Sequence, residues 1–350
     1  MDDNFPVSDP DATPAYKSLP GKISETYTYG QVKATHAVNV QLLETYWQIG
    51  QHIVEFEQGG NVRATYGKAL ISTLSRDLTL LHGKGFSRSN IVYMRLLYLR
   101  SPISQKPSHQ LSWSHFVELL KIDDDLERKF YENQSIAEKW SVPQLKRQKD
   151  TALFQRIALS KNKAEILNLS AEGQQISKPT DILRDPYVFE FLKIPEEQLP
   201  SEQELENLLS NNLQQFLLEL GKGFTYVGRQ YRMTINNKHY RVDLVFYHRI
   251  LRCFVLFDLK INEVQHGDIG QMNLYLGYFA NEENTESDNP PIGIILTKHK
   301  DELLIEYATY GMSSQLFVSK YQLYLPDKAD LIALVNHTLR SEEGDHQKTE

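Results

Sequence analysis

Cysteine and long apolar runs are scarce in this sequence. Among 350 residues Cys253 is the single cysteine, so the chain cannot close an internal disulfide, and a reducing cytoplasm is the expected location. No apolar run approaches the roughly 20 residues that a membrane-spanning helix needs. The N-terminus also lacks the basic start and apolar stretch of a secretory signal. The sequence therefore predicts a cytoplasmic protein without a membrane partner, long enough for two domains.

An overall excess of positive charge is also absent, because the net charge is −7. The total alone argues against a nucleic-acid partner, but the distribution does not. Residues 62–165 hold 18 Lys and Arg against 10 Asp and Glu, a local net of +8 that leaves −15 for the remainder. A basic region can bind phosphate backbones while an acidic remainder maintains solubility. An ordinary solvated helical face fits the same count, so charge alone leaves both interpretations open.

Changes of pattern along the chain divide it into five segments. Residues 1–24 and 341–350 are expected to be disordered tails. Helical spacing predicts an all-helical domain over 25–163, and polar residues without a clear period predict a linker over 164–182. Residues 183–340 combine helices with strands, including strands expected at PIGIILT and near LLIEYAT. The expected fold class is therefore α+β, with a helical domain followed by a mixed α/β domain.

The helical domain contains a candidate DNA-binding unit. Helix, glycine turn (HGKGFS) and arginine-bearing helix (RSNIVYMRLLYLR) resemble a helix-turn-helix. Ser87 is expected to cap the second helix, and Gly50 to end an earlier one. Any helical hairpin shares this outline, so a plain hairpin remains open. The candidate DNA contacts are Lys84, Arg88, Arg95, Lys146 and Arg147.

Two aspartates interrupt the apolar strands of the stretch RVDLVFYHRILRCFVLFDLK. If the turn is centred after Ile250, Asp243 faces Asp258 with side chains about 5 Å apart, which is unfavourable unless a positive charge lies between them. Two carboxylates, a backbone carbonyl and waters suit Mg²⁺. Lys260 points to the same side of its strand as Asp258, where it could orient a metal-bound water or stabilise negative charge on a phosphate. A modest ion pair between Asp258 and Lys260 is the plain alternative.

Helices on either side of these strands add candidate residues. Glu206 heads an apolar stripe on the preceding helix, so its carboxylate could reach the metal site or simply complement the helix N-terminus. Gln271 and Tyr275 lie four residues apart on one face of the following helix. They could position a phosphate, or belong to an ordinary amphipathic helix.

Together, Glu206, Asp243, Asp258-Leu259-Lys260 and Gln271-x-x-x-Tyr275 resemble the PD-(D/E)XK nuclease superfamily in order and spacing. AVNVQLLETYWQIGQHIVE, DLVFYHRILRCFV and GQMNLYLGYF are similar to segments of the YhcG-like nuclease family, and the resemblance covers roughly residues 30–330. It implies a restriction-endonuclease-like domain behind a helical DNA-binding domain, acting as a Mg²⁺- or Mn²⁺-dependent endodeoxyribonuclease. The implied metal ligands are Asp243, Asp258, Leu259 through its carbonyl, and Glu206.

The resemblance also implies roles for other residues. Lys260 would orient or activate the attacking water, and Gln271, Tyr275 and Gln230 would support the site. DNA is the implied partner, a homodimer would suit cutting of both strands of a duplex, and restriction or defence partners are associated with such families.

Two positions depart from the pattern. Val242 replaces the proline of the superfamily name, and Asp258 stands where the narrower family usually has glutamate. The shorter side chain could shift a metal by about 1 Å, enough to affect positioning. A catalytically weak or inactive DNA-binding or assembly subunit is therefore the alternative function. RNA cleavage ranks last, because no RNA-recognition strand motif with stacking aromatics is present.

Overall fold

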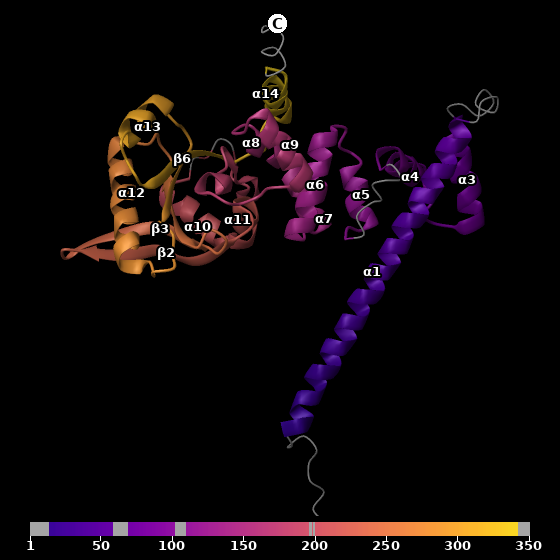
Figure 1. Ribbon diagram of the computed structural model, residues 1–350, viewed down its shortest axis with the longest axis horizontal. Coiled ribbons are helices and arrows are strands. Elements are labelled where there is room, and N and C mark those ends of the chain that lie inside the picture. The colour runs from indigo at the N-terminus through magenta and orange to yellow at the C-terminus, as the bar shows by residue number, and fades with distance from the viewer. Residues whose placement is uncertain (1–13, 59–68, 102–109, 196–197, 199, 342–350) are drawn as a thin grey trace, which may run out of the picture. The chain divides into compact units, whose positions relative to one another are not determined.

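The computed structural model describes residues 14–58, 69–101, 110–195, 198 and 200–341 (Figure 1). The chain divides into two compact units, Met1–Asp123 and Asp124–Glu350, which we call unit 1 and unit 2. Within the described ranges no helix is long and apolar enough to cross a membrane. Most of both expected disordered tails lies outside the described residues.

Unit 1 is helical, as expected for this part of the chain. Ser87 caps one of its helices, because its hydroxyl accepts a hydrogen bond from the Asn90 amide at 3.3 Å, so the predicted cap is confirmed. The N-terminal helix begins within the segment expected to be disordered. The helices are α1 (Pro14–Gln58), α3 (Leu70–His82), α4 (Arg88–Arg100) and α5 (Trp113–Leu119).

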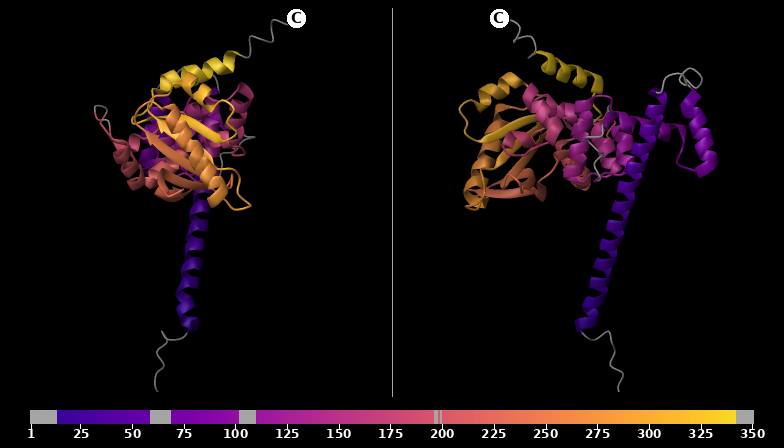
Figure 2. Two further views of the ribbon diagram at one scale, coloured as in Figure 1. Left: turned by 90° about the vertical axis from the view of Figure 1, so that its left-hand side faces the viewer. Right: turned by 45° about the vertical axis from the view of Figure 1, so that its right-hand side comes forward.

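Gly50 does not end α1, which continues as one helix to Gln58 (Figures 1 and 2). The glycine lies where α1 crosses α4, and a Cβ at this position would come within 2.1 Å of the Met94 carbonyl oxygen. The predicted helix stop is wrong because this glycine permits close packing of two helices and does not turn the chain. The buried apolar residues of these two helices are Leu43, Ile53, Val54, Ile91, Met94 and Leu97.

Unit 2 begins with four helices before its sheet: α6 (Asp125–Glu138), α7 (Val142–Asp150), α8 (Leu153–Ala158) and α9 (Lys163–Glu172). The last of these occupies part of the segment expected to be a linker. Asn162 and Glu165 cap it reciprocally, each side chain accepting from the other residue's amide, and Ile166 and Leu169 are buried. The domain boundaries expected at residues 163 and 183 stay a prediction.

A six-stranded mixed sheet forms the centre of unit 2, in the order β1-β6-β5-β4-β3-β2. Strands β2, β3 and β4 form the predicted antiparallel meander, whereas β4, β5, β6 and β1 run parallel. The strands are β1 (Tyr187–Val188), β2 (Phe224–Ile235), β3 (Lys238–His248), β4 (Cys253–Lys260), β5 (Ile292–Thr297) and β6 (Gln315–Gln322).

Helices cover both faces of this sheet, so the expected mixed α/β fold is confirmed. The stretch LLIEYAT is a helix, and its prediction as a strand is wrong, because the parallel strands β5 and β6 need a crossover between them. The helices are α10 (Glu202–Asn211), α11 (Leu213–Leu220), α12 (His266–Tyr278), α13 (Glu302–Thr309) and α14 (Lys328–Ser341), with short turns η3 (Pro179–Ile182), η4 (Glu190–Leu192) and η5 (Phe279–Glu283).

Side chains alternate along the strands and give unit 2 two cores. Helices α10 and α11 pack Leu209 and Phe216 against Phe246 and Phe257 on one face. Helix α12 packs on the other face, where its buried side chains meet Val245, Leu256 and Ile295. This period of two is the expected pattern for strands buried on both faces.

A buried ion-pair cluster joins the helices of unit 2 to the sheet. Glu219 of α11 is fully buried, and its Oε1 accepts from Arg156 Nη1 at 2.6 Å and from the Val188 amide at 3.0 Å. Its Oε2 accepts from Arg147 at 3.2 Å and lies 3.9 Å from Arg184 Nη1. Burial acts to raise the pKa of Glu219, but the three arginines outweigh it and lower the pKa to about 2.

This cluster predicts a loss of stability in acid. An unfolded glutamate titrates near ~4.3, so a folded pKa of about 2 means that Glu219 contributes fully above that range. The contribution, about 3 kcal/mol, is lost as pH falls from the unfolded pKa through the folded one. We expect chemical denaturation of the wild type to show this decline below about pH 5. Glu219→Gln should flatten it, and an unchanged pH slope in that variant would contradict the assignment.

Candidate active site

The hairpin of β3 and β4 has the register that the sequence predicted. Leu244 pairs with Phe257 and His248 pairs with Cys253, and Asp243 and Asp258 are the next residues beyond the last pair on each strand. The Leu259 amide donates to Asp243 Oδ2 at 2.8 Å. The predicted juxtaposition of the two aspartates is thus present at the open end of the hairpin.

Lys260 lies against Asp258 on the same strand. Its Nζ is 2.8 Å from Asp258 Oδ2 and 3.7 Å from Asp268 Oδ1. Burial, with the nearby Asp243 charge, raises the pKa of Asp258 to about 6 although Lys260 opposes the shift. Burial acts to lower the pKa of Lys260, but the Asp258 carboxylate prevails and raises it. The lysine is therefore a cation beside a carboxylate that burial makes easier to protonate.

Gln230 connects Glu206 to Asp243. Its Nε2 donates to Glu206 Oε2 at 2.6 Å and to Asp243 Oδ1 at 3.1 Å. Gln230 has a φ of 48°, a left-handed conformation that non-glycine residues rarely adopt and that is often found at functional sites. The expectation that Gln230 faces the site agrees with this geometry.

Glu206 brings a buried carboxylate to the site from α10. Its side chain is 3% exposed, and its Oε1 has no hydrogen-bond partner among the described residues. A buried carboxylate oxygen without a donor calls for a cation or a water molecule. Glu206 is linked to Asp243 through the Gln230 side-chain amide, which donates a hydrogen bond to both carboxylates.

Helix α12 supplies the glutamine and tyrosine of the predicted site. Gln271 Nε2 donates to Tyr275 Oη, and Tyr275 is buried whereas Gln271 is exposed. Burial is the main cause of the raised pKa of Tyr275, and the charges of Asp258 and Asp243 add to it although the Gln271 hydrogen bond opposes them. The charges of both aspartates thus contribute to the raised pKa of Tyr275.

Two acidic residues near the site escaped the sequence reasoning. Glu202 Oε1 accepts from the Ile261 amide at 3.3 Å, directly after Lys260. Asp268 lies near Lys260, as described, and accepts from the Gln265 amide at 2.8 Å. Both carboxylates stand in the first turn of a helix, a pattern that indicates a helix start but not its proximity to a strand end.

The donor set fits a divalent metal ion held with waters. In the described part of the chain no group of three His, Cys, Asp or Glu side chains is close enough to form a full protein cage. Mg²⁺ does not require one, because it usually keeps several waters and takes only one or two carboxylates. Asp243 and Asp258 supply two carboxylates, the Leu259 carbonyl is adjacent, and the free Glu206 oxygen could bind a metal-linked water.

The predicted DNA contacts differ in their surroundings. Lys84 and Arg88 of unit 1 and Lys146 of unit 2 are exposed, whereas Arg95 Nε pairs with Glu57 at 2.7 Å. Arg147 has a side chain only 14% exposed and belongs to the buried ion-pair cluster described above. Its expected phosphate contact conflicts with this position, because a surface pattern of basic residues does not reveal a buried acidic partner.

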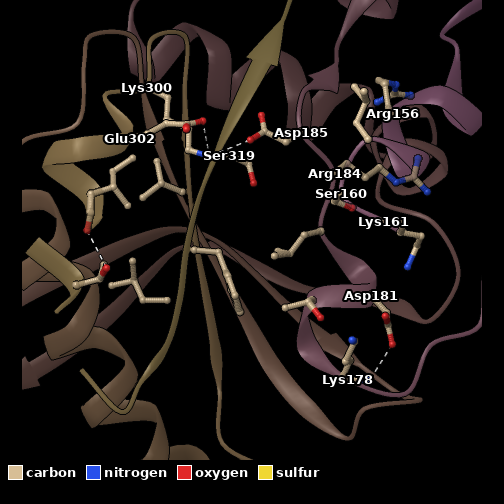
Figure 3. A pocket seen from close by; sticks show the side chains of 18 of the residues that line it. Arg156, Ser160, Lys161, Lys178, Asp181, Arg184, Asp185, Lys300, Glu302 and Ser319 are labelled. Atoms are coloured by element: carbon tan, nitrogen blue, oxygen red, sulfur yellow. Dashed lines mark hydrogen bonds and ion pairs between the residues drawn. The ribbon is translucent and has the colours of Figure 1, made fainter. Parts of the chain in front are cut away.

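A cavity of about 750 Å³ opens elsewhere in unit 2, between α8, α13 and β6 (Figure 3). None of the predicted site residues lines it. Among its ionisable side chains, Lys300 Nζ pairs with Asp185 Oδ2 at 3.0 Å, and Asp181 accepts from the Lys178 amide at 2.9 Å. The predicted site residues therefore lie at the hairpin and not at this cavity.

Comparison with known proteins agrees with the geometry. Residues 180–335 match the family model of the YhcG PDDEXK nuclease domain, and residues 22–156 match the DUF1016 N-terminal domain. The protein YhcG of Escherichia coli (strain K12) is 36% identical over 352 residues, which cover 91% of this chain and 93% of that protein.

Two solved structures are similar over a smaller part. A repair endonuclease from Pyrococcus abyssi is 21% identical and an EndoMS–dsDNA complex 18% identical, each with a TM-score of 0.26 over 38% of this chain. This chain spans about half the length of each, since 50% of those chains is covered.

Proposed function

The chain belongs to the YhcG family of PDDEXK nuclease-domain proteins, and on that premise we propose that it is a divalent-metal-dependent endonuclease that hydrolyses phosphodiester bonds in DNA. The observation that supports this most strongly is the convergence at the open end of the β3–β4 hairpin. Asp243, Asp258 and Lys260 meet there, and Gln230 adds the buried Glu206.

The two aspartates would hold Mg²⁺ or Mn²⁺ together with the Leu259 carbonyl. A bound metal of this kind polarises a phosphoryl oxygen and lowers the pKa of a coordinated water. The chain itself holds the carboxylates in place: the Leu259 amide fixes Asp243, and Gln230 bridges Asp243 to Glu206. Pre-oriented ligands of this sort avoid reorganisation during the reaction.

Lys260 would act from the end of β4, where its ammonium group lies 2.8 Å from Asp258 Oδ2. From there it can donate hydrogen bonds to a phosphate oxygen or orient the attacking water. Gln271 and Tyr275 would support this arrangement from α12, where Tyr275 is buried and accepts a hydrogen bond from Gln271.

One observation favours a second function, a DNA-binding or assembly subunit that does not cleave. The Lys260 ammonium group lies 2.8 Å from Asp258 Oδ2. Lys260 therefore already supplies part of the positive charge that a metal would otherwise place beside Asp258. The shorter side chain of Asp258 acts in the same direction, because it withdraws the carboxylate from a metal.

The test compares the wild type with Lys260→Ala on labelled linear, branched and single-stranded DNA, with Mg²⁺, Mn²⁺ or EDTA. We expect metal-dependent cleavage by the wild type and a loss of about 10²–10³-fold in the variant, the usual effect of removing one charge-stabilising group. Lys320→Ala is the matched control, since this exposed lysine of β6 lies outside the site. Binding by both proteins with cleavage by neither would favour the second function, and cleavage of RNA alone would overturn DNA as the substrate.

A further inference from the structure

One stretch of unit 2 carries only positive charge. No Asp or Glu occurs between Glu219 and Asp243, in a chain whose net charge is −7. Residues 229–241 of this stretch form the end of the β2–β3 hairpin, which we call the basic ribbon, and its turn at Asn236 and Asn237 has the left-handed φ values of 46° and 63°. The basic ribbon projects beyond the rest of the sheet (Figure 1). Its basic residues are Arg229, Arg232, Lys238, His239 and Arg241.

The two faces of the basic ribbon differ sharply. On one face, Met233 is buried and Tyr231 and Tyr240 pack against the core beneath α12. The other face is exposed, and Arg232 pairs with Arg241 directly across the two strands. The packed face fixes the ribbon to the nuclease domain, so the exposed arginines have a defined direction.

The exposed arginines have no acidic partner. Among the residues that the structure describes, no carboxylate lies within ion-pair distance of Arg232, Lys238 or Arg241, and Arg232 contacts only the His239 ring, at 2.9 Å. Like charges directly opposed on a sheet are destabilising. An external anion that binds both arginines would remove this repulsion.

The arginines of the basic ribbon lie close to the candidate active site along both strands. Arg232 follows Gln230 by two residues on β2, and Arg241 precedes Asp243 by two residues on β3. At about 3.3 Å per residue, each arginine is displaced by roughly 7 Å along its strand from a site residue. An anion on the arginine pair would therefore be a neighbour of one bound at the aspartates.

We propose that the basic ribbon binds the phosphate backbone of duplex DNA beside the cleaved bond, with Arg232 and Arg241 each contacting a phosphate. The inference rests on the proposed function and extends it to the way the substrate is held. Guanidinium groups bind phosphate in a bidentate manner, and the major groove of DNA admits a two-stranded β-ribbon. Phosphate contacts position a duplex without reading its bases, so the ribbon acts independently of sequence.

The test measures duplex binding without cleavage, by fluorescence anisotropy of a labelled duplex with full-length protein in EDTA at several salt concentrations. For Arg232→Ala combined with Arg241→Ala, we expect the slope of log affinity against log salt to fall by about 1.8, or 0.9 per phosphate, and the affinity to fall at least about tenfold. Arg249→Ala combined with Arg252→Ala is the control, because it removes two exposed arginines at the opposite end of β3. Duplexes of different sequence should lose affinity equally.

Several outcomes would overturn the inference. Wild-type affinity and salt slope in the Arg232/Arg241 double variant would do so, as would equal losses in the Arg249/Arg252 control. Losses on single-stranded DNA without losses on the duplex would overturn the duplex placement. The proposed function is tested separately, by metal-dependent cleavage with Lys260→Ala, whereas the ribbon is tested by duplex binding in EDTA. If the wild type cleaves DNA and the Arg232/Arg241 double variant binds the duplex as tightly as the wild type, only the ribbon inference is overturned.

Discussion

Replacing Asp258 by asparagine is expected to reduce metal-dependent DNA cleavage by about 10³-fold or more, since a catalytic metal contributes several kcal/mol to transition-state stabilisation. The amide has nearly the shape of the carboxylate but lacks its charge, so Asp243 would face the metal alone. The cleavage rate on a labelled DNA gives the first measurement. Calorimetric titration with Mg²⁺ gives a second that does not depend on turnover, and it should show weakened binding.

Two further variants sharpen this prediction. Asp258→Glu keeps the charge and has the side chain that is usual in the family, so it should retain cleavage. Asp330→Asn is the matched control, because this exposed aspartate of α14 is outside the site. Mg²⁺ affinity and cleavage at wild-type levels in Asp258→Asn would sink the assignment of Asp258 as a metal ligand.

Replacing Glu219 by glutamine is expected to lower the free energy of unfolding of unit 2 by about 3–5 kcal/mol, the usual effect of removing one partner from a buried ion pair. The neutral amide would leave the buried Arg156 and Arg184 side chains without a compensating charge. Chemical denaturation at neutral pH, followed by circular dichroism, measures the loss.

Glu286→Gln serves as the control for this variant, because Glu286 is exposed and should tolerate the same change within about 0.5 kcal/mol. Equal stability of the Glu219 and Glu286 variants would show that the cluster does not hold the helices of unit 2 to α11. Arg147 provides a second check: Arg147→Ala should destabilise unit 2 as well, because its guanidinium group bonds both Glu190 and Glu219.

The hairpin shows how far local pattern can lead. Apolar alternation and a short turn predicted which residues of β3 and β4 face each other, and the observed pairing of His248 with Cys253 has that register. A strand repeats every two residues, so a slip of one would have turned every apolar side chain to the wrong face. The placement of Asp243 opposite Asp258 therefore followed from the sequence.

Other features depended on partners distant in the chain. The sequence pattern predicted Arg147 as a surface cation. In the structure it pairs with the buried Glu219, which is 72 residues later in the chain. Gln230 carried no signal of its own, because its role depends on the left-handed turn of the backbone that points it at Glu206 and Asp243. The spacing of apolar residues within one helix or strand does not predict contacts between residues so far apart in the sequence.

What the sequence by itself determined is the fold class, the hairpin register and the residues that meet at the hairpin's open end, because these follow from the periods of strands and helices and from residue chemistry. Only the tertiary structure decided that Gly50 lies at a helix crossing, that LLIEYAT is a crossover helix, and that Arg147 is paired with the buried Glu219. Each of these depends on which surfaces are brought together. That choice is made by packing between segments far apart in the chain, and a local pattern does not contain it.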